Sequence, residues 1–141
     1  MSEAGRLAAA YQATSYRVFL PAGCLELRVG QGNAELERWL KEVGAREWAI
    51  LTAWNPGSKV LTPRENGERQ AALECRLLEE GLEPYAGENE ADDGAWPVEE
   101  TCFVPNISLA LAREMARQFG QNAILAGAVG EAAKLVWIDG E

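Results

Sequence analysis

The stretch ILTAWNPGSKVLTPREN, residues 50–66, predicts a buried strand that leads through a tight turn into a helix. Residues 48–54 are apolar at nearly every position, a pattern typical of a central strand that is covered on both faces. Asn55 precedes a proline, so we expect it to have an extended backbone, whereas Gly57 can adopt the positive φ of a type II turn. The junction therefore combines a sharp chain reversal with side chains that can form hydrogen bonds.

The helix that follows has a clear start. Thr62 and Glu65 form a capping-box pattern around Pro63, which is favoured at the first helical position. We expect this helix to run to about residue 80 and to end at Gly81.

Polar side chains replace apolar ones on the inner face of this helix. Leu73 and Leu77 should face the core, and helical periodicity places Gln70 and then Asn66, with Arg69 close beside it, on the same side. Buried amide and guanidinium groups need hydrogen-bond partners. These side chains must therefore meet solvent, the preceding turn or a ligand.

The rest of the sequence mixes hairpin-like pairs of strands with helices, an order that indicates an α+β fold. We predict a single domain over residues 1–141, a two-layer sandwich in which about three helices cover a mixed, mostly antiparallel sheet. The other predicted elements are helices at 3–13, 33–44 and 108–120, and strands at 16–20, 25–29, 82–86, 101–104, 123–126 and 134–138.

Length, charge and hydropathy restrict the class of protein. The 141 residues are 48% hydrophobic and 25% charged, which suits one globular domain. A net charge of −9 disfavours nucleic acids and anionic membrane surfaces as partners, because binding to them draws on Lys and Arg. No apolar run approaches the ~20 residues that span a bilayer, and the start of the chain is a poor match to a signal peptide, so we expect a cytoplasmic protein.

The absence of histidine excludes several kinds of catalytic site. Without it the chain cannot form a Ser-His-Asp triad, a Cys-His pair or a His-ligated metal centre. The three cysteines are widely spaced, odd in number and without a CxxC pattern, so they do not form a disulfide framework. We predict no metal and no cofactor, and the sequence assigns no catalytic residue.

Polar residues at the ends of several segments predict a small binding site. Asn55 and Ser58 lie in the turn, and the arginines of the following helix suit recognition of carboxylate or phosphate. Bracing of the turn and capping of helix ends are structural explanations for the same residues. The candidate ligand-binding residues are Asn55, Ser58, Arg64, Asn66, Arg69, Gln121 and Asn122.

Residues 88–100 are rich in acidic side chains and predict a solvated loop. Trp96 lies within this segment, and a tryptophan in a polar loop usually docks on another part of the protein. It can cover the core or close the predicted site. Neighbouring carboxylates such as Glu99 and Glu100 point apart and therefore give no acid–base pair.

The chain also carries a longer pattern that spans most of its length. Its parts are Tyr11-x-Ala13-x-x-Tyr16, Leu51-Thr52-Ala53-Trp54-Asn55-Pro56, Asn66, Trp96 and Phe119-Gly120-Gln121-Asn122-Ala123-Ile124. This combination resembles the bacterial family called domain of unknown function 3293. The resemblance implies a small bacterial protein, no assigned activity, and a shared site near the junction. Residues 99–103 depart from the Glu-Pro-Ser-Phe-like stretch that the family leads us to expect.

Three functions fit these patterns. The first is a module that binds a small polar or anionic molecule at the junction 52–70. The second is an enzyme in which Arg64 or Arg69 clamps the substrate, an asparagine of the junction stabilises the transition state, and Glu65 is the base. The third is a protein-interaction domain whose acidic surface meets a basic partner.

Overall fold

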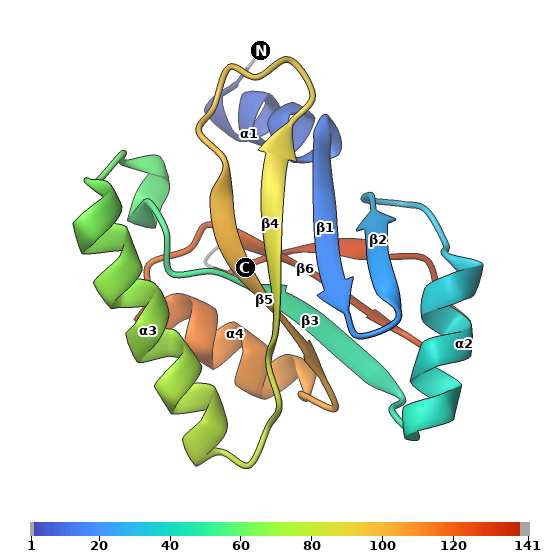
Figure 1. Ribbon diagram of the computed structural model, residues 1–141. Helices are drawn as coiled ribbons and strands as arrows, with labels where there is room; N and C mark the ends of the chain where they lie inside the picture. Colours follow the sequence, from blue (N-terminus) through green and yellow to red (C-terminus); the bar gives the residue numbers. More distant parts are fainter. Residues whose placement is uncertain (1, 139–141) are drawn as a thin grey trace.

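The computed structural model describes residues 2–138 as one curled sheet with helices on its faces (Figure 1). The helices are α1 (Glu3–Gln12), α2 (Ala34–Val43), α3 (Pro63–Glu79) and α4 (Leu109–Gln118), and a short 3-10 turn, η1, spans Pro56–Ser58. The strands are β1 (Thr14–Leu20), β2 (Gly23–Leu27), β3 (Glu47–Leu51), β4 (Tyr85–Ala91), β5 (Glu99–Pro105), β6 (Ala123–Ala128) and β7 (Lys134–Trp137).

The seven strands form one sheet in the order β2-β1-β4-β5-β3-β6-β7, and each pair of neighbours is antiparallel. This arrangement confirms the predicted α+β class. Strand β3 lies between β5 and β6 and is buried from Trp48 to Leu51, as expected of a central strand. The sheet is strongly twisted, so that β1, β2 and β4 cross the direction of β3 (Figure 1).

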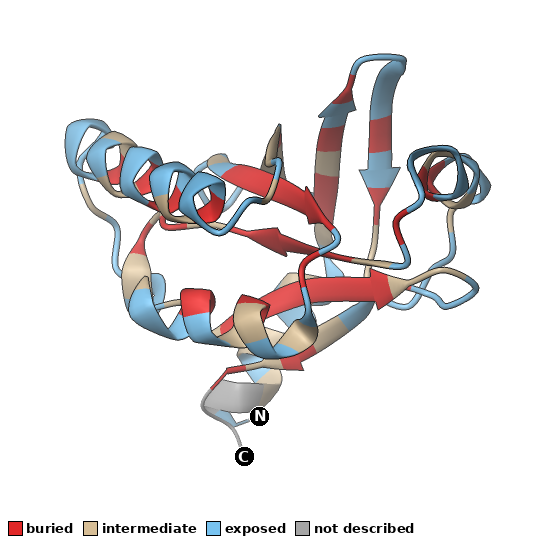
Figure 2. Ribbon diagram, turned by 90° about the horizontal axis from the view of Figure 1, so that it is seen from below, coloured by how far each residue is buried: buried red, intermediate tan, exposed pale blue. Residues whose placement is uncertain are grey.

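The two faces of the sheet carry separate apolar clusters. On one face Leu73 of α3 and Met115 of α4 pack against strand residues. On the other face Leu40 of α2 packs in a cluster with Trp48 and Phe103. The helices are buried toward the sheet and exposed on their outer sides (Figure 2). Alternation along each strand therefore decides which cluster a side chain joins.

The helix starts follow the capping residues that the sequence predicts. The Thr62 hydroxyl accepts a hydrogen bond from the Glu65 N–H at 3.1 Å, and the Glu65 carboxylate accepts the Thr62 N–H at 3.0 Å, which completes a capping box. Asn33 caps α2 by accepting the Leu36 N–H, and Ser108 caps α4 by accepting the Leu111 N–H. Within residues 2–138, every helix falls short of the length and hydropathy that crossing a bilayer requires.

Strand β3 ends at Leu51, before the end of the predicted segment 48–54. After Leu51, backbone N–H groups donate to side chains instead of to a neighbouring strand. The N–H of Ala53 donates to the Gln70 side-chain oxygen at 2.9 Å. The N–H of Trp54 donates to the Thr52 hydroxyl at 3.1 Å. Local side-chain acceptors of this kind end a strand by satisfying its backbone groups elsewhere.

Strand β4 begins and ends later than the predicted 82–86, and β5 begins before the predicted residue 101, so the prediction of a loop over 88–100 is wrong for residues 88–91 and 99–100. Glu88 and Glu90 lie in β4 and pair with Arg17 of β1 at 3.5 and 2.7 Å. These cross-strand pairs make an acidic segment compatible with a strand. The connecting loop is confined to residues 92–98, between β4 and β5.

Candidate functional site

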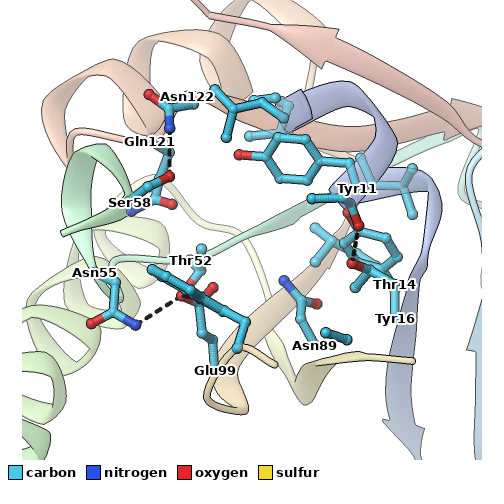
Figure 3. Close-up of a pocket in the computed structure, with 18 residues that line it drawn as sticks. Tyr11, Thr14, Tyr16, Thr52, Asn55, Ser58, Asn89, Glu99, Gln121 and Asn122 are labelled. Carbon is cyan, nitrogen blue, oxygen red and sulfur yellow. Dashed lines mark hydrogen bonds between the residues drawn. The ribbon is translucent and has the colours of Figure 1, made fainter. Parts of the chain in front are cut away.

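A cavity of about 210 Å³ opens beside α1, on the sheet face that also carries the α2 cluster. Eighteen residues line it, and they come from α1, five strands or strand ends, the turn at η1, the loop between β4 and β5, and the connection between α4 and β6 (Figure 3). The apolar part of its wall is Leu7, Ala10, Ile50, Ala91, Ala123, Ile124 and Leu125. The polar and aromatic part is Tyr11, Thr14, Tyr16, Thr52, Asn55, Ser58, Asn89, Trp96, Glu99, Gln121 and Asn122.

Strand register builds the floor of the cavity. Tyr16 of β1 is opposite Asn89 of β4, and Asn89 is opposite Glu99 of β5. Directly paired residues project to the same face of a sheet, so these three side chains form a row across three strands. The Asn89 side-chain oxygen is buried and has no hydrogen-bond partner among the described residues.

Aromatic side chains form much of the wall. Tyr11 of α1 packs edge-on against Trp137 of β7, with ring centroids 5.8 Å apart. Burial, with a smaller contribution from the charge of Glu99, raises the pKa of Tyr11 to about 12. Burial and the nearby Tyr11 and Glu99 also raise the pKa of Tyr16. Both phenols therefore stay neutral and face a site that already contains an acid.

The turn after β3 is held by a pair of asparagines. The Asn55 N–H donates to Asn66 Oδ1 at 2.8 Å, and Asn66 Nδ2 donates to Asn55 Oδ1 at 2.8 Å. Asn55 Oδ1 also accepts the Leu61 N–H at 2.9 Å. The prediction of an extended Asn55 is wrong: its φ of 46° and ψ of 61° are left-handed, a conformation that asparagine tolerates and that these bonds stabilise.

Arg69 and Gly120 fasten this turn to the end of α4. The Arg69 guanidinium donates to the carbonyl of Ala53 at 2.8 Å and to the carbonyl of Phe119. The Gly57 N–H donates to the Gly120 carbonyl at 2.7 Å. Gly120 has a φ of 71°, and a Cβ there would lie 2.9 Å from the Pro56 Cβ. The close approach therefore requires glycine at this position.

Two further amides connect the same segments at the edge of the cavity. Gln121 Nε2 donates to the Trp54 carbonyl at 3.0 Å. Asn122 Nδ2 donates to the Ser58 hydroxyl at 2.9 Å. These contacts bring the turn and the end of α4 together.

The seven candidate residues fall into three groups. Asn55, Ser58, Gln121 and Asn122 line the cavity. Asn66 and Arg69 lie behind the turn and brace it without lining the cavity. Arg64 also lies outside the lining, and its side chain is 88% exposed with Glu68 3.6 Å away.

Glu99, which sequence reasoning gave no role, is the only charged residue among those that line the cavity. Its Oε2 accepts hydrogen bonds from Trp96 Nε1 at 2.7 Å and from Asn55 Nδ2 at 2.9 Å. Burial raises the pKa of Glu99, and these two hydrogen bonds oppose the rise. The carboxylate forms no ion pair with any described residue.

A signal for Glu99 was present in the strand pattern. Thr101 and Phe103 are buried, and alternation places Glu99 on the same face as both. Glu100 points to the opposite face and is exposed. The two carboxylates therefore diverge, as predicted, and Glu99 alone faces the cavity.

Trp96 lines the cavity from the loop between β4 and β5, with 37% of its surface exposed. Its indole is anchored on Glu99, so the loop folds back over the site. Glu65, the base of the hypothetical enzyme, lies outside the lining. Its hydrogen bonds with Thr62 lower its pKa, which makes it a poorer base.

No group of three or more Cys, Asp or Glu residues within residues 2–138 is arranged to hold a metal ion. A family model described as "Protein of unknown function (DUF3293)" matches residues 51–124, slightly more than half of the chain. The matched segment contributes Asn55, Asn89 and Glu99 to the cavity, whereas Tyr11 and Tyr16 precede it. Curated proteins and solved structures yield no match.

Proposed function

We propose that this protein, which belongs to the family described as protein of unknown function (DUF3293), binds a small organic molecule in the cavity. The family description assigns no activity, so the proposal depends on the cavity. The ligand has a compact apolar body and at least one polar group. A volume of about 210 Å³ suits a small metabolite, and the mixed lining has the character of a ligand pocket.

The observation that carries this proposal is a cavity whose polar residues are already held in place. Asn55 has its backbone fixed by Asn66, and Asn122 is fixed by Ser58. A left-handed non-glycine residue that its surroundings stabilise is common at ligand sites. Side chains held in this way lose little conformational entropy when a ligand binds, which favours affinity.

The charge of the lining argues against an anionic ligand. Arg64 and Arg69 do not line the cavity, and Glu99 does. An anion there would meet a carboxylate with no cation to compensate it. The proposal therefore specifies a neutral or positively charged molecule, in contrast to the anionic ligand that the arginines suggested.

A matched pair of variants tests the proposal. Ala9 and Ala10 are both exposed on α1, but only Ala10 lines the cavity. We expect native mass spectrometry of the wild-type protein, after incubation with a metabolite extract, to detect a discrete added mass. Ala10→Phe, which fills the cavity, should lose that mass, and Ala9→Phe should retain it.

The melting temperature of each variant shows whether it is folded. A mass that binds Ala10→Phe as well as it binds the wild type would place the ligand elsewhere and contradict the proposal. Absence of any added mass to the wild type, over extracts of several pH values, would also count against it.

A further inference from the structure

Glu99 has one carboxylate oxygen in use and one available. Both hydrogen bonds from the described residues, from Trp96 and from Asn55, go to Oε2. Oε1 accepts none of the hydrogen bonds found among residues 2–138. It is also not one of the buried polar atoms that lack a partner, so it remains accessible. The cavity therefore offers a carboxylate oxygen to whatever enters it.

The surroundings of this oxygen supply no positive charge. The residues that line the cavity include no Lys or Arg, and Arg69 directs its guanidinium to the carbonyls of Ala53 and Phe119. A partly buried carboxylate without a cation is costly, and a cation that enters with the ligand would offset that cost. The net charge of −9 also attracts cations to the protein as a whole.

Aromatic rings surround the same space. Tyr11 and Tyr16 lie across the cavity from Asn55 and Glu99 (Figure 3). Burial, with a smaller contribution from the charge of Glu99, raises the pKa of both tyrosines. Trp96 supplies a third ring on the Glu99 side. Ring faces attract organic cations, and a carboxylate adds a direct ion pair.

We infer that the ligand carries a protonated amine, which pairs with Oε1 of Glu99 and lies among the rings of Tyr11, Tyr16 and Trp96, an inference that rests on the proposed function. The apolar part of the ligand then lies against Leu7, Ile50 and Leu125. The ligand class is a small primary amine with an aromatic or aliphatic body.

Two small compounds of similar shape test this inference. 2-Phenylethylamine carries the ammonium group, and 2-phenylethanol replaces it with a neutral hydroxyl. Each is titrated into ¹⁵N-labelled protein, and the shifts of the cavity amides and the Trp96 indole N–H are followed. We expect the amine to bind about tenfold more tightly than the alcohol or better, because it adds a charge-assisted hydrogen bond.

Two glutamate variants provide the comparison. Glu99→Gln keeps the size of the side chain and removes its charge, so the two compounds should bind it with affinities within about threefold of each other. Glu100→Gln removes the same charge from the neighbouring residue on the opposite face, and it should retain the preference of the wild type.

The outcomes separate the inference from the proposed function. Equal affinities in the wild-type protein, or a preference for the amine that persists in Glu99→Gln, would overturn the amine inference and leave a binding pocket. If neither compound gives saturable shifts of cavity residues, both the inference and a pocket for ligands of this size are contradicted. The dispersion of the amide signals in the NMR spectrum of Glu99→Gln shows whether this variant is folded.

Discussion

Asn55 and Asn66 bind each other through two hydrogen bonds of 2.8 Å, one from backbone to side chain and one between the side chains. Asn66 is 2% exposed, and Asn55 is 3% exposed. The pair links the turn after β3 to the first turns of α3. Asn66 therefore acts on the site indirectly, by holding Asn55 in position. Asn55 itself lines the cavity and donates a hydrogen bond to Glu99.

Replacement of Asn66 tests this division of roles. Asn66→Ala leaves the Asn55 N–H buried without its acceptor, so we expect the free energy of unfolding to fall by about 1–3 kcal/mol. Urea denaturation followed by circular dichroism measures the change. Glu68→Ala, on the exposed side of the same helix, should change stability by less than about 0.5 kcal/mol. Equal effects of the two substitutions would show that the buried amide pair is not important for stability.

Removal of the Glu99 charge should stabilise the protein at neutral pH. Glu99 has a raised pKa in the folded state because of burial. Its contribution to stability is therefore complete below its unfolded pKa and is lost as the pH rises through its folded pKa. Glu99→Gln avoids that loss, and we expect a gain of about 0.5–2 kcal/mol near pH 7.

The pH dependence is the specific signature of this effect. The difference in melting temperature between Glu99→Gln and the wild type should grow from about pH 4 to about pH 7, since the other acids titrate alike in both proteins. Thermal unfolding at several pH values measures it. A constant difference, or one that shrinks toward neutral pH, would mean that Glu99 is not destabilised by its surroundings.

The Trp96 indole should hold down the pKa of Glu99. Its hydrogen bond to Oε2 is the larger of the two that oppose the effect of burial. Trp96→Phe keeps an aromatic ring and removes the donor, so the Glu99 pKa should rise further above its usual value. Carboxyl ¹³C NMR across a pH titration measures this pKa. An unchanged or lower pKa in Trp96→Phe would contradict the importance of this hydrogen bond.

The contact between Gly120 and Pro56 can be separated from backbone strain. Gly120 and Gly130 both have a positive φ, of 71° and 87°. A Cβ at Gly120 would lie 2.9 Å from Pro56, whereas nothing lies within 4 Å of one at Gly130. Alanine at either position carries the cost of a left-handed backbone, about 1 kcal/mol. We expect Gly120→Ala to cost about 1–3 kcal/mol more, because the turn must also move.

Urea denaturation of the two glycine variants provides the comparison. A larger loss for Gly120→Ala supports the close packing of the turn against the end of α4. Equal losses of stability would show that the turn moves to accommodate the added Cβ. The wall of the cavity near Ser58 would then be easily deformed.

Local chemistry made much of the fold predictable. The capping box at Thr62 and Glu65 and the left-handed stop at Gly44 depend on neighbouring residues only, so the sequence contains all the information needed. The extent of β4 depends on Arg17, which is distant in the chain and pairs with Glu88 and Glu90. Such long-range pairing overrides a local preference for loop, which is why the prediction for residues 88–91 failed.

The candidate site was predictable to the extent that it lies at segment ends. Polar residues after a strand and after a helix stop pointed to Asn55 and to Gln121 with Asn122, and these do line the cavity. Tyr16 and Glu99 lie in the sheet itself, and their place in one row depends on strand order and register. Alternation within β5 places Glu99 on an inner face, but the sequence does not specify the strand order, so the row that Glu99 forms with Tyr16 could not be predicted.

The row from Tyr16 to Glu99 also governs when the cavity can form. Strand β1 pairs with β4, and Ser15 of β1 donates a hydrogen bond to Asp92, which lies just after β4 and 77 positions away in the chain. Contacts of such sequence separation form slowly, because the entropy of closing a long loop must be lost before the contact is made. The Asn89–Glu99 part of the row is local to the β4–β5 pair, and the row is complete only when β1 has joined β4. A ligand of this cavity would accordingly stabilise the assembled sheet, because it contacts β1, β4 and β5 together and binds only the folded protein.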